Sequence, residues 1–119
     1  MRFTATGGGP PLINTAGETS KSSGSLVDGS GDPIGSWSYR CTYLGELTSA
    51  TITHYCSITN SLEGRGKLVL AGGIVWDSND VQWQTVIRAT GRYGGHTGFA
   101  KLDNLNSAST SFTVYLVKG

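Results

Sequence analysis

Residues 89–99 read Ala-Thr-Gly-Arg-Tyr-Gly-Gly-His-Thr-Gly-Phe and follow the apolar run at 81–87. Four glycines fall within the eight positions from Gly91 to Gly98, and strand-like sequence continues on both sides. Glycines inside a strand pattern mark bulges, sharp bends or close approach of two backbones. A sheet that closes into a small barrel needs such bends. This stretch therefore predicts a tightly curved, closed sheet, whose interior is where a function would reside.

The rest of the chain alternates between strand patterns and clusters of turn residues. No window keeps a 3.6-residue apolar period over the length of a helix. We expect an all-β fold, a small closed antiparallel barrel of about eight strands over residues 23–119, preceded by an irregular N-terminal arm over residues 1–22 with a short strand at Arg2–Thr6. A barrel is favoured over a sandwich because closure removes exposed edges in a chain with few charges to protect them. The other expected strands are 23–27, 34–44, 50–60, 67–76, 81–89, 98–105 and 111–118.

Composition limits the classes of function. The 119 residues suit one domain, with 37% hydrophobic and 14% charged residues and a net charge of +1. No Lys/Arg cluster occurs, so neither nucleic acid nor an anionic membrane is an expected partner. No apolar stretch approaches the ~20 residues of a membrane-spanning helix. The N-terminus lacks the apolar region of a secretory signal, so we expect a cytoplasmic protein.

Two cysteines flank a predicted hairpin. Cys41 and Cys56 lie at equal distances from its centre, so they can face one another across two strands and form a disulfide. The alternative is a pair of reduced, buried thiols that act as small apolar residues. The missing signal sequence favours the reduced thiols. Neither cysteine has the spacing of a metal site.

Strand alternation sorts the side chains into two faces. If Cys41 faces Cys56, then Tyr43 faces His54, Tyr39 faces Ile58, and the apolar sets of the two strands merge into one interior face. Tyr55 points outward in this register, although a shift of one residue would reverse it. Such an interior is either a ligand cavity or a core filled by its own side chains. The residues expected to contact a ligand are Trp37, Tyr39, Tyr55, Ile58, Trp83, Ile87, Phe99 and Phe112.

Tyr43 and His54 are the polar pair that this register brings together inside the barrel. They could hydrogen-bond a substrate carbonyl or move a proton, which makes them the candidate catalytic residues. A purely structural histidine explains His54 equally well. The sequence contains no nucleophile elbow, no phosphate-binding loop and no metal-ligand spacing, so we expect neither a cofactor nor a metal.

Three segments carry a resemblance to a known superfamily. Thr-Gly-Arg-Tyr-Gly-Gly-His-Thr-Gly at 90–98 resembles the Thr-Gly-x-Tyr-x-Gly-x-x-Gly signature of the allene oxide cyclase and dirigent-like barrels. Asp-Pro-Ile-Gly at 32–35 with Tyr-Arg-Cys at 39–41, and Leu-Glu-Gly-Arg-Gly at 62–66, resemble two further signatures of that superfamily, in the same order. Within it, the run at 92–99 is most similar to the bacterial spirotetronate and spirotetramate cyclases.

This resemblance implies a cofactor-independent cyclase of the Diels–Alderase type in natural-product biosynthesis. A linear conjugated polyketide would fold inside the barrel for an intramolecular [4+2] cycloaddition, and orientation alone can lower such a barrier by up to ~7–11 kcal/mol. The alternative is a non-catalytic dirigent-like or carrier barrel that binds a small apolar ligand, and a weaker one is a filled barrel that serves as an interaction module. The low charge and the exposed Thr, Tyr and Val faces are compatible with a homo-oligomer such as a dimer.

Overall fold

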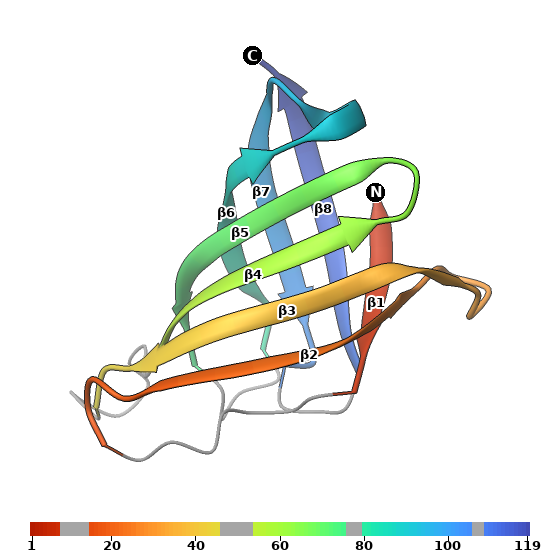
Figure 1. The fold of residues 1–119 in the computed structure, drawn as a ribbon. Helices are drawn as coiled ribbons and strands as arrows, with labels where there is room; N and C mark the ends of the chain where they lie inside the picture. Colours follow the sequence, from red (N-terminus) through yellow and green to blue (C-terminus); the bar gives the residue numbers. More distant parts are fainter. Residues whose placement is uncertain (8–14, 46–53, 76–79, 106–108) are drawn as a thin grey trace.

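The computed structural model describes residues 1–7, 15–45, 54–75, 80–105 and 109–119. Eight strands form a closed barrel in which each strand pairs with the next in an antiparallel manner, and the last pairs with the first (Figure 1). The all-β barrel predicted from the sequence is therefore confirmed. The strands are β1 (Arg2–Thr6), β2 (Thr19–Val27), β3 (Pro33–Tyr43), β4 (His54–Leu62), β5 (Gly66–Ile74), β6 (Gln82–Ala89), β7 (His96–Asp103) and β8 (Ser109–Lys118).

The barrel begins earlier in the chain than the sequence predicted. The short strand expected at Arg2–Thr6 is present as β1, and it closes the barrel between β2 and β8. β2 already begins at Thr19, so the boundary at residue 22 between arm and barrel is wrong. The reason is that alternation in β2 is carried by small serines, which give a weak hydrophobic signal. Of the expected strands, positions 50–53 and 76 lie outside the described residues.

The pairing of β3 with β4 follows the predicted register. Cys41 lies opposite Cys56, Tyr43 opposite His54 and Tyr39 opposite Ile58. The two cysteines are joined by a disulfide bond, and both are fully buried. The favoured expectation of reduced thiols is therefore wrong, because the register brings the two side chains within bonding distance on the interior face.

The glycine-rich stretch connects β6 to β7 and contains a short 3₁₀ turn, η1 (Gly91–Tyr93). Gly91 begins this turn in the left-handed region, at φ 62°, where residues with a side chain are strained. Gly98 then lies on the interior face, where a Cβ atom would collide with the backbone carbonyl oxygen of Tyr115 on β8. The stretch thus supplies a sharp turn and a close backbone approach, as the sequence predicted.

The inward and outward faces of β6 are exchanged relative to the prediction. We expected Trp83 and Ile87 to face the interior, but both are exposed on the outside, while Gln84 and Val86 are buried. The interior direction of β6 is set by pairing, since Val86 lies opposite the buried Leu70. Apolar residues occur on both faces of this strand, so hydrophobicity alone does not distinguish the two registers.

Two further aromatic candidates lie outside the barrel. Phe99 on β7 is exposed, so the expectation that it lines the interior is wrong; it pairs with the exposed Thr85 of β6, which turns it outward with that face. Tyr55 on β4 is also exposed, as its alternation predicted. No helix among the described residues is long and apolar enough to cross a membrane.

Candidate functional site

The two ends of the barrel differ. One end, which we call the Tyr93 end, carries η1, whose Tyr93 side chain is buried against the core. The Tyr93 hydroxyl donates a hydrogen bond to Sδ of Met1 at 3.7 Å, which ties the first residue of the chain to this end. The opposite end, the Tyr43 end, is where β3 ends and β4 begins (Figure 1).

Large side chains of the core cluster point into the middle of the barrel. Trp37, Tyr39, Ile58 and Phe112 all point inward and are buried, as the sequence predicted. The rings of Trp37 and Tyr39 stack with their centroids 5.6 Å apart, and the indole nitrogen of Trp37 donates a hydrogen bond to the carbonyl of Thr6 at 3.0 Å. A continuous aromatic cavity that includes both Trp37 and Trp83 is not formed, because Trp83 lies outside.

Tyr43 and His54 come together at the Tyr43 end. They are opposite one another in the β3–β4 register, and their ring centroids are 5.0 Å apart with an interplanar angle of 43°. His54 is buried and Tyr43 is half-buried. The pair offers a phenol hydroxyl and an imidazole beside the interior of the barrel. Such groups can donate a hydrogen bond to a carbonyl or exchange a proton with a bound molecule.

Tyr39 lies two interior positions before Tyr43 on β3, with Cys41 between them, and has polar neighbours that the sequence analysis did not single out. Burial raises the pKa of the Tyr39 phenol, while hydrogen bonds with the side chains of Ser22 and Ser20 lower that pKa. Both serines are on β2, on the face that points into the barrel. The sequence does contain a clue to these contacts. Side chains two residues apart on a strand share a face, so Ser20 and Ser22 lie on the same face as the buried Leu26.

Two glutamines of β6 also point inward, where the sequence placed Trp83. The amide nitrogen of Gln84 donates to the carbonyl oxygens of Cys56 at 3.2 Å and Gly72 at 3.3 Å. The side chain of Gln82 accepts a hydrogen bond from the backbone N–H of Val75 and donates to its carbonyl, both at 2.7 Å. These hydrogen bonds pair the Gln82 amide and the amide nitrogen of Gln84 inside the barrel, whereas the amide oxygen of Gln84 is buried without a partner among the described residues.

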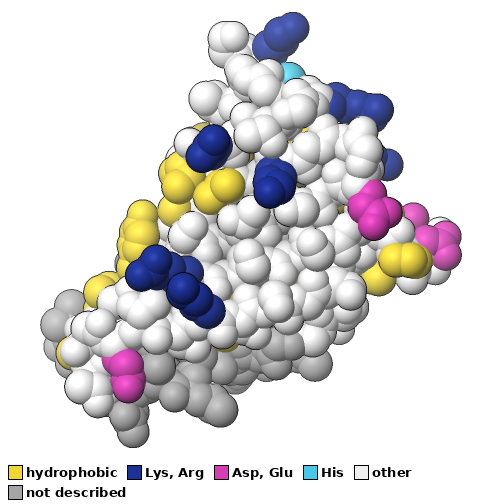
Figure 2. Space-filling model, in the orientation of Figure 1, with side chains coloured by type: hydrophobic (Ala, Val, Ile, Leu, Met, Phe, Trp, Pro, Cys, Tyr) yellow, Lys and Arg dark blue, Asp and Glu magenta, His cyan; other side chains and the backbone are white. Residues whose placement is uncertain are grey.

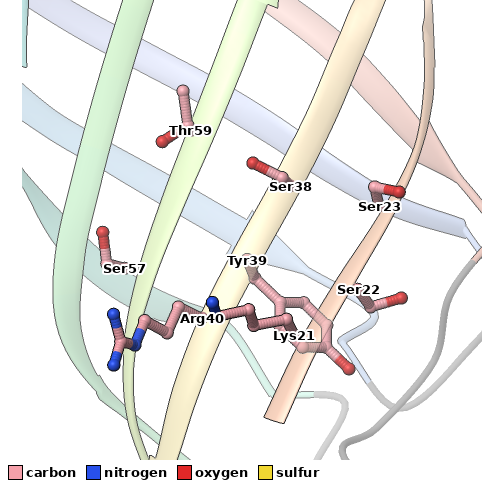
Figure 3. A pocket seen from close by; sticks show the side chains of 8 residues that line it. All are labelled: Lys21, Ser22, Ser23, Ser38, Tyr39, Arg40, Ser57 and Thr59. Atoms are coloured by element: carbon pink, nitrogen blue, oxygen red, sulfur yellow. The ribbon is translucent and has the colours of Figure 1, made fainter.

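A separate hollow lies on the outside of the barrel, over β2, β3 and β4 (Figure 3). Its volume is about 410 Å³, and the hydroxyl side chains of Ser23, Ser38, Ser57 and Thr59 contribute to its wall. Lys21 and Arg40 lie opposite one another in the strand register and are both exposed. Figure 2 shows Lys and Arg side chains gathered in a cluster over these strands. The hollow is lined by Lys21, Ser22, Ser23, Ser38, Tyr39, Arg40, Ser57 and Thr59.

Comparison with known proteins supports the fold. No family model matches the sequence, and no curated protein matches it. Among solved structures, the chain is similar to pyocyanin demethylase, with a TM-score of 0.78 and 15% sequence identity over 98% of each chain. A likeness at this identity establishes a shared small barrel fold. Among the described residues, no group of three or more His, Cys, Asp and Glu side chains could hold a metal ion.

Proposed function

We propose that this protein binds a small, largely apolar molecule at the Tyr43 end of its barrel and holds one polar group of that molecule with Tyr43 and His54. The observation that carries this proposal is the contact between these two rings, 5.0 Å apart by their centroids, at the end of the barrel opposite Tyr93. Ligand sites in small barrels combine apolar walls with a few orienting polar groups, and barrel mouths are among the places where such sites occur.

The finer proposal is a cofactor-independent cyclase, as the resemblance to the spirotetronate cyclases implies. In an intramolecular [4+2] cycloaddition two carbon–carbon σ bonds form at the expense of π bonds, and no atom or electron is gained or lost. The protein then needs only to fold the polyene and to polarise the carbonyl next to the dienophile. A hydrogen bond from the Tyr43 hydroxyl or the His54 ring to that carbonyl supplies the polarisation.

A specific observation favours a second candidate, a carrier that binds its ligand without turnover. The side chains of Trp37, Tyr39, Ile58 and Phe112 occupy the middle of the barrel, so a ligand at the Tyr43 end is not enclosed along its whole length. Catalysis by orientation requires close confinement of both reacting ends. The name of pyocyanin demethylase indicates that one barrel of this fold acts on a small molecule, which supports ligand binding more than it supports cyclisation.

The experiment offers a panel of linear conjugated polyenes with a terminal carbonyl-activated double bond. Cyclisation is followed as loss of polyene absorbance and formation of a product of unchanged mass, and binding is measured separately by calorimetry. We expect the double variant Tyr43→Phe, His54→Ala to lower the rate at least about tenfold while the barrel stays folded. Tyr115→Phe, which removes an exposed hydroxyl on the outside of β8, is the matched control.

The outcomes separate the proposals. Binding without product, lost in the double variant, identifies a carrier. A product formed by the wild type and the double variant at equal rates removes Tyr43 and His54 from the mechanism. Failure of every compound in the panel to bind argues against an apolar ligand at this end of the barrel.

The disulfide bears on where the protein works. Disulfides persist in oxidising compartments and are rare in the reducing cytoplasm. We therefore propose an oxidising compartment in place of the cytoplasmic location expected from the sequence. The test is thiol alkylation of the protein taken directly from its own cells, followed by mass analysis. Alkylation of Cys41 and Cys56 without prior reduction would contradict this location.

A further inference from the structure

The outer face of β6, β7 and β8 exposes a group of large apolar side chains. These side chains are Trp83 (54% exposed), Ile87 (60%), Phe99 (59%), Tyr115 (52%) and Val117 (66%). Scattered apolar residues are normal on a protein surface, but a contiguous patch of several hundred Å² marks a surface that another molecule covers. We call these five residues the apolar face.

The residues of the apolar face lie next to one another. Phe99 on β7 is directly opposite Tyr115 on β8, and the ring of Tyr115 lies 6.1 Å from that of Trp83 on β6, measured between centroids. Thr85 and Thr97 fill positions between them on the same side of the sheet. The apolar face is therefore continuous across three strands.

We propose that the apolar face is the interface through which two copies of this chain associate. A half-exposed aromatic or branched side chain offers roughly 100 Å² of surface, so the five residues together offer roughly 500 Å². The threonines between them and the residues at the rim bring this area toward the ~800 Å² per partner of a standard stable interface. Trp, Tyr and Phe, which form its centre, are also enriched at the centres of protein interfaces.

The distribution of charge favours a second copy over a different partner. Lys101 and Asp103 lie two residues apart on β7, so their side chains leave the same side of the sheet, beside the apolar face. A two-fold axis places residues of one copy against different residues of the other, so a surface that carries both signs can complement itself. A strongly acidic or basic partner would instead be matched by a surface of one sign.

The first test uses the wild-type protein and an internal control. Tyr115 and Tyr55 are both 52% exposed, but Tyr55 lies on β4, outside the apolar face. Hydroxyl-radical footprinting should therefore label them equally in a monomer and protect only Tyr115 in a dimer. Sedimentation velocity over a range of micromolar concentrations gives the mass in parallel. A monomer at all these concentrations, with equal labelling of the two tyrosines, would overturn the proposal.

The second test compares matched variants. Tyr115→Ser and Phe99→Ser should weaken dimerisation at least about tenfold, because each removes an aromatic contact from the centre of the interface. Tyr55→Ser removes the same area elsewhere and should leave the dimer unchanged. Equal effects of Tyr115→Ser and Tyr55→Ser would refute the assignment of this face. A second result would also refute it: a monomeric wild type that sediments with phosphatidylcholine vesicles by contacts of Trp83. The apolar face would then bind lipid.

Discussion

Replacing Asn60 by leucine should stabilise this protein, although it changes a fully buried residue. Asn60 lies on the interior side of β4, between Trp37 on β3 and Leu68 on β5 in the strand register. It is 0% exposed, and neither its amide nitrogen nor its amide oxygen has a hydrogen-bond partner among the described residues. Leucine has the same branching as asparagine and carries methyl groups in place of the two polar atoms. The substitution therefore removes the unpaired amide and keeps the shape of the side chain.

The size of the effect follows from two opposing contributions. Burial of an amide without compensating hydrogen bonds costs about 1–3 kcal/mol. The larger volume of the two methyl groups costs about 1 kcal/mol in a closely packed interior. The free energy of unfolding of Asn60→Leu should therefore exceed that of the wild type by up to about 2 kcal/mol. In a domain of this size such a gain raises Tm by up to about 8 °C.

The assay is urea unfolding followed by circular dichroism, with thermal unfolding as a second measurement. Asn60→Asp is the matched control, because it keeps the shape and adds a charge that no described neighbour compensates. It should lower the free energy of unfolding at pH 7 by at least about 3 kcal/mol. A loss of more than about 1 kcal/mol in Asn60→Leu, with an unchanged slope against urea, would refute the reasoning. It would mean that the Asn60 amide makes hydrogen bonds worth more than its burial costs.

Three further predictions concern stability. Reduction of the Cys41–Cys56 disulfide, which spans 15 residues, should lower the free energy of unfolding by about 3 kcal/mol, measured by calorimetry with and without reductant; an unchanged Tm would contradict it. Lys21→Glu should stabilise the barrel by about 0.2–1 kcal/mol, less at high salt, because Lys21 and Arg40 are like charges directly opposite one another; a destabilised variant would count against this. Burial raises the pKa of Tyr39 in the folded state. The stability that this shift contributes is therefore complete below pH ~10 and is lost as the pH rises through the folded-state pKa. Ultraviolet difference titration of the wild type and Tyr39→Phe can measure this loss, and identical alkaline unfolding of the two proteins would exclude it.

Much of the barrel could be predicted from the sequence because most strands have two distinct faces. On β3 aromatic residues and Cys41 alternate with serines and Arg40, so only one register buries the apolar set. The same argument places Tyr43 opposite His54. The candidate site at the end of these strands was therefore accessible from the period of two alone.

The face of β6 could not be predicted in the same way. Val86 lies on the opposite face from Trp83 and Ile87, so apolar residues occupy both sides of the strand. The hydrogen bonds of Gln84 reach backbone carbonyls on β4 and β5, so they exist only once these strands lie beside β6. Ser22 on β2 was missed because a serine gives no hydrophobic signal. The hydrogen bond that Ser22 makes depends on Tyr39, which lies opposite it on the neighbouring strand β3.

The sequence by itself determined that this chain forms a closed sheet of short strands, because its alternation and its glycines act locally. The tertiary structure decided three things: that Cys41 and Cys56 form a disulfide, that large side chains occupy the middle of the barrel, and that Trp83 and Phe99 face outward. Each depends on which strand lies on the other side of a residue. For the cysteines the facing register was predictable from the hairpin, and the structure decided only that they are bonded. For Trp83 and Phe99 the neighbour is set by the pairing of β6 and β7 within the assembled barrel, which no local window of the sequence contains.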